Sequence, residues 1–472
     1  MDRLDPTSAL LEALGDWARP AGPLYRRLAT ALSHAITTGE LACGQRLPAE
    51  RSLAAALAVS RATVVAAYDE LRAIGMVTSR RGSGTTVSAL PPTAASGRAP
   101  DGHAKALFRR LVDGAGPMIS LATAAEPAAE EVAHALEEVA RHDLPELMAQ
   151  AGYHPRGLPA LREAVAARYA ELGLPTEADQ VLITTGAAQA IGLIARMYVP
   201  RGAHVVVESP GWPGCFDIFR AEGARLLGVA LDDEGIRIDE LARVLREHRP
   251  ALICLMPTFH NPTGTLMSAS RRRRVAELAA QHSVPVVEDN AYPWTAQRPA
   301  PLAAHAGADA TVLTVESLTK TVWGGLRIGW LRAPEHAADR LARYKALADL
   351  GNPLLDQALA ARLLPRLTEI EARHTASARS RLDQLGALLT DRLPEWSWHA
   401  PDGGTALWID IGADTRTFAQ VALRHGVEVV PGALLDPSGG HEHWLRLPFT
   451  FPPSVLTELV ERLRRAWQEL SR

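Results

Sequence analysis

Residues 89–116 lack sustained apolar periodicity and divide this chain of 472 residues into two unequal parts. The stretch holds Pro91-Pro92, an Ala-Ser-Gly run and the sequence Ala-Pro-Asp-Gly at 99–102. Proline, glycine and small polar residues at this density are typical of a linker. We therefore expect a small N-terminal domain over residues 1–88 and a much longer C-terminal domain over residues 117–472.

The pattern of the N-terminal part predicts three short helices followed by a hairpin. Apolar residues at helical spacing predict the first helix, which Gly39 ends, and Ser60 is placed to cap the third. Two helices joined by a tight turn and followed by a hairpin with a basic, glycine-rich tip form a winged helix-turn-helix. The predicted elements are the helices Leu24–Thr38, Arg51–Leu57 and Arg61–Ile74 and the strands Met76–Arg80 and Thr85–Ser88.

Several polar residues of this domain are placed to bind DNA. The first turn of a recognition helix faces the base edges, which here places Ser60, Arg61 and Thr63. Arginines at the start of the preceding helix and near the hairpin tip can contact phosphates or enter a groove. These arginines are Arg51, Arg80 and Arg81. The alternative is a small helical domain that binds protein and carries a solvated basic face.

Three segments of this domain resemble the GntR class of bacterial winged-helix regulators. They are Leu-Pro-Ala-Glu-Arg-Ser-Leu-Ala at 47–54, Val-Ser-Arg-Ala-Thr-Val at 59–64 and Arg-Gly-Ser-Gly-Thr at 81–85. The resemblance implies double-stranded operator DNA as a partner. By this resemblance the DNA-contacting positions are Arg51, Arg61, Thr63 and Gly82. Val65 stands where some members carry another contacting arginine, so their operator preferences need not transfer.

Beyond the linker, apolar strand-like runs alternate with longer helical patterns. Such alternation predicts an α/β domain with a mainly parallel sheet covered by helices. The predicted strands are Val181–Thr185, His204–Glu208, Ala251–Met256, Val284–Glu288 and Ala310–Val315.

Lysine is so rare that chemistry requiring a primary amine has three candidate residues in the whole chain. Lys105 lies in the linker and Lys345 on a charged helical pattern, whereas Lys320 follows a predicted strand among hydroxyl-bearing residues. Apolar surroundings lower the pKa of a lysine and allow it to form a Schiff base with an aldehyde. The nearby hydroxyls and Arg327 suit a dianionic phosphate. This segment therefore predicts pyridoxal 5'-phosphate (PLP) as the cofactor.

Other segments supply the remaining contacts that PLP needs. The turn Gly186-Ala187-Ala188 leads from a strand into a helix whose free backbone amides form an anion site. Asp289 ends a strand, where its carboxylate can pair with the pyridine nitrogen. Asn261 and Tyr292 can hydrogen-bond the phenolic oxygen, and Trp212 offers a flat face for stacking.

With these motifs the C-terminal part resembles the fold-type-I PLP enzymes, the aspartate aminotransferase superfamily. The resemblance implies a smaller α+β subdomain beside the sheet. It makes Lys320 the catalytic Schiff-base lysine and Arg446 the residue that binds a substrate α-carboxylate. Tyr153 matches the tyrosine that reaches the neighbouring subunit's phosphate, which implies a homodimer. The implied cofactor-binding set is Lys320, Asp289, Asn261, Tyr292, Trp212, Ala187, Ala188, Ser317, Arg327 and Tyr153.

Structural roles are the alternative for three of these residues. Trp212 can be plain core, Arg446 can belong to an ion pair, and Tyr153 can be a surface turn residue. Lys320 has no comparable alternative, because the phosphate-binding and ring-binding residues all stand in register with it.

Composition and spacing exclude several other classes of protein. Hydrophobic residues make up 47% and charged residues 22%, which is ordinary for a globular chain. The three cysteines, Cys43, Cys215 and Cys254, fit free thiols in a reducing compartment. No apolar run is long enough to span a membrane, and the histidines show no metal-ligand spacing. We expect a cytoplasmic bacterial protein without a metal or a membrane partner.

A GntR-like head, a linker and an aminotransferase-like domain in one chain resemble the MocR family of bacterial transcription regulators. The resemblance implies a homodimer, often head-to-tail, that senses an amino acid, an amine or a vitamin B6 form through an external aldimine. The alternative is an active α-amino-acid aminotransferase that retains a DNA-binding head, so catalytic turnover stays open. A degenerate fold that no longer binds PLP is a third possibility.

Three positions depart from the MocR pattern. His260 stands before Asn-Pro-Thr-Gly where relatives usually have Gln or another polar residue, which can alter effector contacts. The run Glu288-Asp289-Asn290-Ala291-Tyr292 keeps the spacing of true aminotransferases and favours turnover. Phe216 stands where many regulators carry Arg, which argues against a second bound carboxylate.

Overall fold

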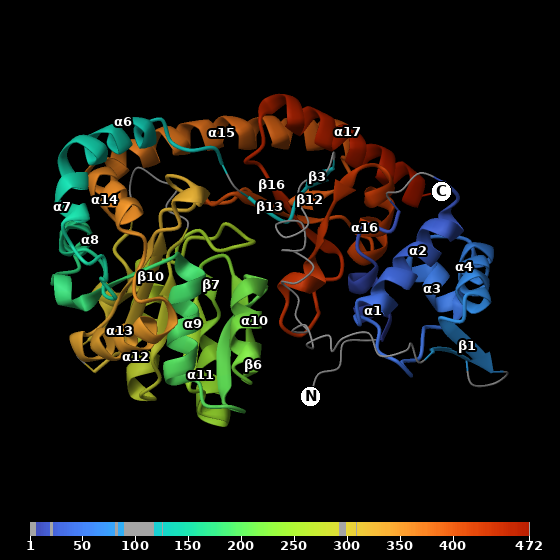
Figure 1. Ribbon diagram of the computed structural model, residues 1–472, viewed down its shortest axis with the longest axis horizontal. Helices are drawn as coiled ribbons and strands as arrows, with labels where there is room; N and C mark the ends of the chain where they lie inside the picture. Colours follow the sequence, from blue (N-terminus) through green and yellow to red (C-terminus); the bar gives the residue numbers. More distant parts are fainter. Residues whose placement is uncertain are drawn as a thin grey trace.

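The computed structural model describes residues 6–18, 22–80, 84–88, 118–124, 126–291, 299–307 and 309–471. The predicted linker, residues 89–116, lies outside them, as do Tyr292 and the hairpin tip at 81–83. The described parts form a small N-terminal head, a large domain built on one sheet, and a smaller domain between the two (Figure 1).

The head is the winged helix-turn-helix that its sequence predicts. Leucines of its four helices share one core, in which Leu28, Leu32, Leu53 and Leu57 are fully buried. Ser60 caps the recognition helix as expected, since its hydroxyl accepts a bond from the Thr63 amide at 3.1 Å. The elements are α1 (Pro6–Leu14), α2 (Leu24–Thr37), α3 (Glu50–Ala56), α4 (Arg61–Ala73), β1 (Val77–Arg80) and β2 (Gly84–Val87). Sequence analysis missed α1.

The large domain is built on an eight-stranded sheet in the described part of the chain, in the order β4-β11-β10-β9-β8-β5-β6-β7. Strands β10, β9, β8, β5 and β6 run parallel, while β11 and β7 are antiparallel to their neighbours. The strands are β4 (Val181–Thr184), β5 (His204–Ser209), β6 (Arg225–Asp232), β7 (Gly235–Ile236), β8 (Leu252–Leu255), β9 (Val286–Asp289), β10 (Val312–Ser317) and β11 (Gly329–Arg332). The predicted mainly parallel sheet is confirmed.

Helices cover both faces of this sheet, because its strands bury side chains on both sides. Val181 and Ile183 of β4 belong to one core cluster, and Leu182 between them belongs to the other. The first cluster includes residues of α8 (Pro159–Glu171), α11 (Ile238–His248), α12 (Ala269–Gln281) and α14 (Leu354–Leu363). The second includes residues of α9 (Ala187–Tyr198), α10 (Pro213–Ala221) and α13 (Glu335–Asp349). A sheet buried on both faces is the expected form for parallel strands.

The smaller domain has α+β architecture, as the family resemblance implies. Its four-stranded sheet has the order β12-β13-β16-β15, and β3 (Ile119–Ser120) pairs with β14 (Val427–Glu428). The sheet strands are β12 (Ser397–Trp398), β13 (Ala406–Asp410), β15 (Val430–Pro431) and β16 (Trp444–Pro448), packed with α16 (Thr415–Arg424) and α17 (Pro453–Leu470).

One long helix, α15 (Leu367–Arg392), bridges the large and the smaller domain along the top of Figure 1. Its N-terminal residues Leu367 and Ile370 belong to the core of the large domain, and Leu385 and Leu389 belong to the core of the smaller one. The remaining short elements, α6 (Glu131–Glu138), the π-helical turn η1 (Val139–Asp143) and α7 (Leu144–Met148), lie at the far end of the large domain.

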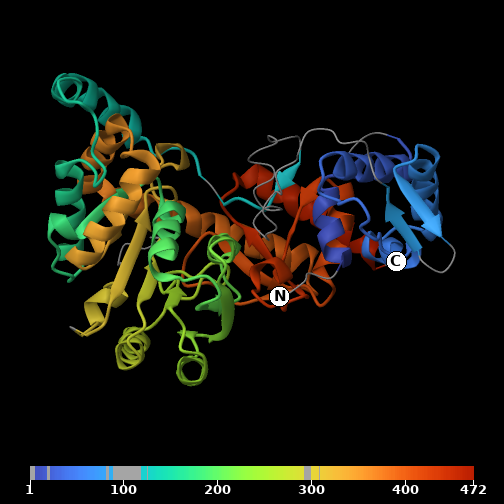
Figure 2. The same cartoon turned by 60° about the horizontal axis from the view of Figure 1, so that its bottom comes forward.

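The head lies against the smaller domain of the same chain, beside α16 in Figures 1 and 2. The indole N–H of Trp17 donates to the side-chain oxygen of Gln420 at 2.9 Å in a buried contact. The Arg424 guanidinium donates to the carbonyl of Leu57, in the turn of the helix-turn-helix, at 3.4 Å. Ala58, the next residue, packs against the core cluster of the smaller domain.

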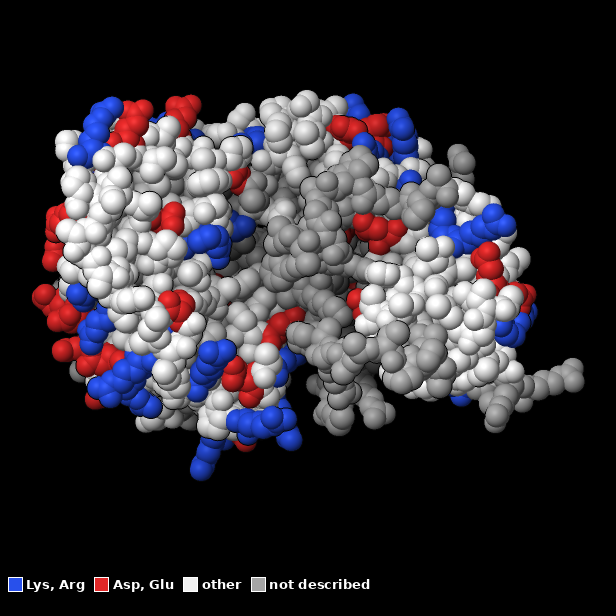
Figure 3. All heavy atoms as spheres, viewed as in Figure 1, with Lys and Arg blue, Asp and Glu red and all other residues white. Residues whose placement is uncertain are grey.

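Charged side chains of both signs are interspersed over the face of the large domain that Figure 3 shows. Many charged side chains of the large domain are paired; Arg271, for example, contacts Asp232 at 3.0 Å and Glu234 at 3.1 Å. This face therefore presents no single-sign patch for a polyanion. Within the described residues, no helix is long and apolar enough to cross a membrane, and no cluster of metal-ligating side chains occurs.

Candidate active site and nucleic-acid interface

The candidate site lies where the strands of the large sheet end. Asp289 ends β9, and the segments with Trp212, Asn261 and Lys320 follow β5, β8 and β10. Arg327 precedes β11, and because that strand is antiparallel its beginning lies at the same edge. Parallel strands bring their carboxyl ends together, which is why residues distant in sequence meet here.

Lys320 is held in a desolvated position. Its Nζ donates to the carbonyl of Ala124 at 2.5 Å. Burial and, to a smaller extent, the nearby Arg446 charge lower the pKa of Lys320 to about 8, while Glu126 opposes the shift. A lysine with this pKa is partly neutral near pH 7–8, and only the neutral amine attacks an aldehyde. Lys345, by contrast, is paired with Asp349 at 2.7 Å.

Asp289 is a buried carboxyl group suited to a cationic partner. It is 2% exposed and accepts a bond from the Ala291 amide at 3.0 Å. Burial and, to a smaller extent, the charge of Glu316 raise its pKa to about 7, while the bond from the Ala291 amide opposes the shift. A protonated ring nitrogen placed against this carboxyl would stabilise its ionised form.

An anion cradle forms from two loops at the same edge. Gly186 precedes α9 at φ +117°, and the Arg327 Nη2 atom lies 3.1 Å from where a Cβ at residue 186 would stand. Ser317 Oγ lies 3.7 Å from the same point, and Arg327 Nη2 also donates to the Thr185 carbonyl at 2.6 Å. Ala187 and Ala188 are the first residues of α9, where backbone amides lack intrahelical partners. The cradle fits a phosphate group.

Arg446 and Asn261 meet at the boundary between the large and the smaller domain. Arg446, on β16, is 5% exposed, and its Nη1 donates to Asn261 Oδ1 at 3.4 Å. Its Nη2 donates to the carbonyls of Leu121 and Ala122 at 2.9 and 2.7 Å. Residues 121–124 thus line the site beside Lys320 and Arg446. Sequence analysis missed them because these backbone carbonyl contacts leave no pattern in side-chain identity.

Trp212 lies at the start of α10 and packs against core residues of both the large and the smaller domain. A Cβ at Gly214 would stand 2.2 Å from its ring, so glycine there lets the indole lie flat on the backbone. Phe216, in the next turn, is fully buried in the large-domain core. Trp212 thus packs between the cores of the two domains, and its stacking on a cofactor ring stays a prediction.

His260 and Glu208 form a buried pair near Asn261. The His260 Nε2 atom lies 3.5 Å from the Glu208 carboxylate, and its Nδ1 lies 2.9 Å from Thr263 Oγ1. Burial lowers the pKa of His260 to about 3 and raises the pKa of Glu208 to about 8. Both side chains are therefore mainly neutral at pH 7, and His260 is packed into the loop that carries Asn261.

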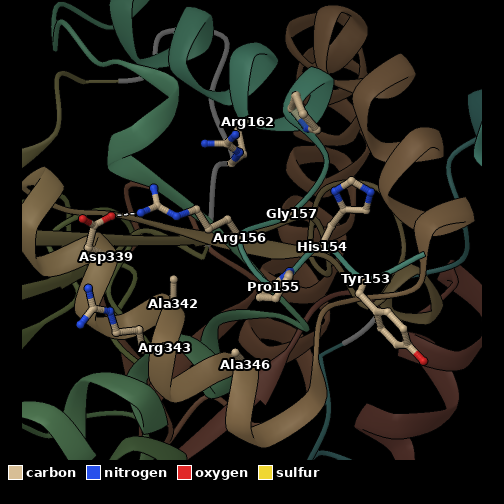
Figure 4. A pocket seen from close by; sticks show the side chains of 11 residues that line it. Tyr153, His154, Pro155, Arg156, Gly157, Arg162, Asp339, Ala342, Arg343 and Ala346 are labelled. Carbon is tan, nitrogen blue, oxygen red and sulfur yellow. Dashed lines mark ion pairs between the residues drawn. The ribbon is translucent and has the colours of Figure 1, made fainter. Parts of the chain in front are cut away.

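Tyr153 lies apart, at the surface of the large domain, and is 70% exposed. It borders a pocket of about 520 Å³ in which Arg156 points toward Asp339 while the Tyr153 ring points away from both (Figure 4). Tyr292, the other tyrosine predicted to contact the cofactor, lies outside the described residues.

The predicted DNA-contacting residues lie on an open side of the head. Arg51, Ser60 and Arg61 are exposed and Thr63 is half-buried, all at the first turns of α3 and α4. Arg61 forms an ion pair with Glu50 at 3.0 Å. In Figure 1, α4 and β1 lie on the side of the head remote from the large domain. The side chain of Arg80, together with Arg81 and Gly82, lies outside the described residues.

Comparisons with known proteins match both parts of the chain. Residues 24–87 match the family model of bacterial regulatory proteins of the gntR family, and residues 120–463 match that of aminotransferase class I and II. The uncharacterized HTH-type transcriptional regulator YisV of Bacillus subtilis is 29% identical over 452 residues, covering 91% of this chain and 92% of the relative.

Two further similar proteins are a regulatory protein and an aminotransferase. The probable rhizopine catabolism regulatory protein MocR of Rhizobium meliloti is 31% identical, with coverage of 68% of this chain and 67% of that protein. The α-aminoadipate aminotransferase LysN of Thermus thermophilus, solved with N-(5'-phosphopyridoxyl)-L-leucine, superimposes with a TM-score of 0.69 at 30% identity, covering 77% of this chain and 95% of that chain. These comparisons confirm the predicted fold.

Replacing Lys320 with Ala should abolish covalent attachment of PLP, because the chain loses the amine that lies in the site. Borohydride reduction of the wild-type protein with PLP, followed by peptide mass analysis, should place the adduct on Lys320. Binding to DNA at low salt should be largely retained in the variant. Loss of folding, measured by circular dichroism, would instead identify a structural lysine.

The rate of covalent PLP uptake should depend on pH with a midpoint set by Lys320. The neutral fraction of an amine with a pKa near 8 rises with pH and levels off above it. Stopped-flow absorbance between about pH 6 and pH 10 should therefore show a plateau above about pH 9. A rate that still climbs in proportion to hydroxide at the upper end would mean that the pKa of Lys320 is that of an ordinary lysine.

Proposed function

The chain belongs to the class I and II aminotransferase family, and because a gntR-type DNA-binding domain precedes that domain, we propose that it is a PLP-dependent regulator that senses a small amine ligand at Lys320. It is a regulator of the MocR type, and its cofactor is PLP. The ligand is an amino acid, another amine or a vitamin B6 form. The observation that carries the proposal is that Lys320, Asp289, Asn261 and the cradle at Gly186 gather at one edge of the large sheet, in a body that holds an open DNA-reading head. We propose that residues 1–88 form the DNA-binding head, residues 89–116 the linker and residues 117–472 the body. We also propose that the protein acts in the cytoplasm.

Each residue of the site has a definite task toward cofactor and ligand. Bound PLP supplies an aldehyde that condenses with amines and a ring that withdraws electrons. Lys320 would hold the cofactor through its ε-amine, and its Nζ can accept or return a proton. Asp289 keeps the ring nitrogen protonated, and the cradle of Ser317 and Arg327 anchors the phosphate. Arg446 offers a guanidinium fork to the α-carboxylate of the ligand.

The position of Arg446 gives a route from the ligand to the head. Arg446 lies on β16 of the smaller domain, and α16 of that same domain holds the head through Gln420 and Arg424. A ligand that changes how the smaller domain lies against the large one would carry the head with it. One neutral hydrogen bond contributes about 1 kcal/mol, or roughly fivefold in an equilibrium, so the contact with Trp17 can bias the head without fixing it permanently.

A second copy of the chain is the proposed partner at the surface around Tyr153. Several large apolar side chains are exposed there, including Leu347 at 89%, and an extended apolar patch, unlike a single exposed residue, is unusual on the surface of a monomer. They belong to α7, the loop before α8, the C-terminal part of α13 and the start of α14: Met148, Tyr153, Tyr344, Leu347, Leu350 and Leu355. A homodimer that buries this face would let Tyr153 reach the partner's phosphate cradle. The head-to-tail arrangement stays a prediction.

An active aminotransferase is the second candidate, favoured by the lowered pKa of Lys320. The 2-aminoadipate transaminase of Thermus thermophilus, 33% identical over 306 residues, is a relative of that class. Mixing the PLP-loaded protein with amino acids and keto acids and following its visible spectrum separates the two functions. Rapid multiple turnover supports the enzyme, whereas a stalled spectral change with altered operator binding supports the regulator.

Replacing Arg61 with Ala should weaken sequence-specific DNA binding more than non-specific binding. A base contact by arginine contributes about 1–3 kcal/mol, so specific affinity should fall about tenfold or more. The specific and the non-specific affinity are measured by titrating two duplexes at the same salt concentration. One duplex carries the operator, located by footprinting, and the other a scrambled sequence. Arg26→Ala, an exposed arginine of α2, is the matched control. An equal loss on both duplexes would make Arg61 a phosphate contact only.

Replacing Gln420 with Leu should uncouple ligand binding from the head. In wild type, ligand changes the operator affinity by a certain factor. In Gln420→Leu this factor should be smaller by up to about fivefold and approach one, because the contact with Trp17 is lost. The ligand used is the standard amino acid that most perturbs the spectrum of the PLP-loaded protein. Gln384→Leu, the same change on α15 away from the head, should leave the factor as in wild type. An unchanged factor in Gln420→Leu would contradict this route.

A further inference from the structure

The first two turns of helix α12 contain four consecutive arginines at 271–274, of which one is fully buried. Arg272 is 0% exposed, whereas Arg273 and Arg274 are exposed. We propose that Arg272 is a positioning residue that fixes the loop Pro257–Met267 and thereby sets the place of Asn261 in the cofactor site. The inference rests on the proposed PLP-dependent function.

The Arg272 guanidinium joins both ends of this loop. Its Nη2 donates to the Pro257 carbonyl at 2.7 Å and to Thr258 Oγ1 at 3.0 Å, at the start of the loop. Its Nε donates to the Met267 carbonyl at 3.0 Å, at the end. The loop is also closed by a bond from the Met267 amide to the Pro257 carbonyl at 2.9 Å. Arg272 therefore fixes the two points from which the loop projects.

The loop between these points needs such support. Phe259 has φ +53°, in the left-handed region that non-glycine residues rarely occupy. Two residues further, Asn261 is 6% exposed and accepts the bond from Arg446 at 3.4 Å. A shift of the Pro257–Thr258 end would move Asn261 relative to both the cofactor ring and Arg446. One buried side chain thus holds a contact for the cofactor and one for the ligand.

Arginine is the residue type that this position requires. A planar fork with donors on three separate nitrogens can serve acceptors at the two ends of the loop together, whereas an ammonium group carries all its donors on one nitrogen. Lysine at position 272 should therefore retain the charge but only part of the restraint. Methionine has similar length and removes both the charge and the donors.

The test compares PLP-loaded Arg272→Met and Arg272→Lys with Arg273→Met, the same change at the exposed neighbour. An amide that donates to the phenolic oxygen of bound PLP stabilises its anionic form, so losing that contact should raise the pH midpoint of the visible absorbance change. We expect a higher midpoint and about tenfold weaker PLP binding in Arg272→Met, with an intermediate result in Arg272→Lys. Arg273→Met should match wild type within about twofold.

A double-variant cycle separates positioning from general stability. In an Asn261→Ala background, Arg272→Lys should no longer move the pH midpoint, because the contact through which it acts is already gone. An equal midpoint shift in both backgrounds, or no effect of either Arg272 variant on a folded protein that binds PLP, would overturn the inference. Because the cycle uses Arg272→Lys, it still tests the inference when Arg272→Met does not fold. Failure of the wild-type chain to take up PLP would instead overturn the proposed function.

Discussion

Buried ionisable groups at one edge of the large sheet impose the constraint on which the rest of the structure depends. Lys320 and Asp289 are both desolvated, which lowers the pKa of the amine and raises that of the carboxyl group. Neither shift favours folding of the chain by itself, since burial of an ionisable group costs free energy unless a partner compensates it. A phosphorylated pyridine aldehyde supplies a carbonyl for the amine and a ring nitrogen for the carboxyl group. The site is therefore arranged around a group that the chain does not contain.

The smaller domain connects this edge to the DNA-binding head. Its strand β16 carries Arg446 into the site, and its helix α16 contacts the head through Gln420 and Arg424. Because both elements belong to one core, they move as one body when that domain moves. The helix-turn-helix is held by its turn at Leu57, while the first turn of α4 stays open. This geometry leaves the first turn of α4 accessible and joins the support of the head to the domain that carries Arg446.

Many of the helices, strands and turns could be predicted from local sequence, because caps, turns and hydrophobic periodicity act over a few residues. The end of α2 near Gly39, the cap at Ser60 and the strands before Lys320 and Asp289 all follow from such signals. Helix α1 was missed because the burial of Leu10, Leu14 and Trp17 depends on tertiary packing. The four arginines of α12 look alike in sequence, yet one of them is buried under the Asn261 loop.

The amino-acid sequence by itself determined the winged head and the mainly parallel sheet, and it indicated Lys320 as the candidate Schiff-base lysine. These properties depend on residue type and short-range spacing, and three lysines in the whole chain leave few candidate amines. Only the tertiary structure decided that backbone carbonyls of residues 121–124 line the site, that Arg272 supports Asn261, and that the head lies on α16. Those contacts join segments far apart in the chain, often through backbone atoms that every residue shares, so no local pattern encodes them.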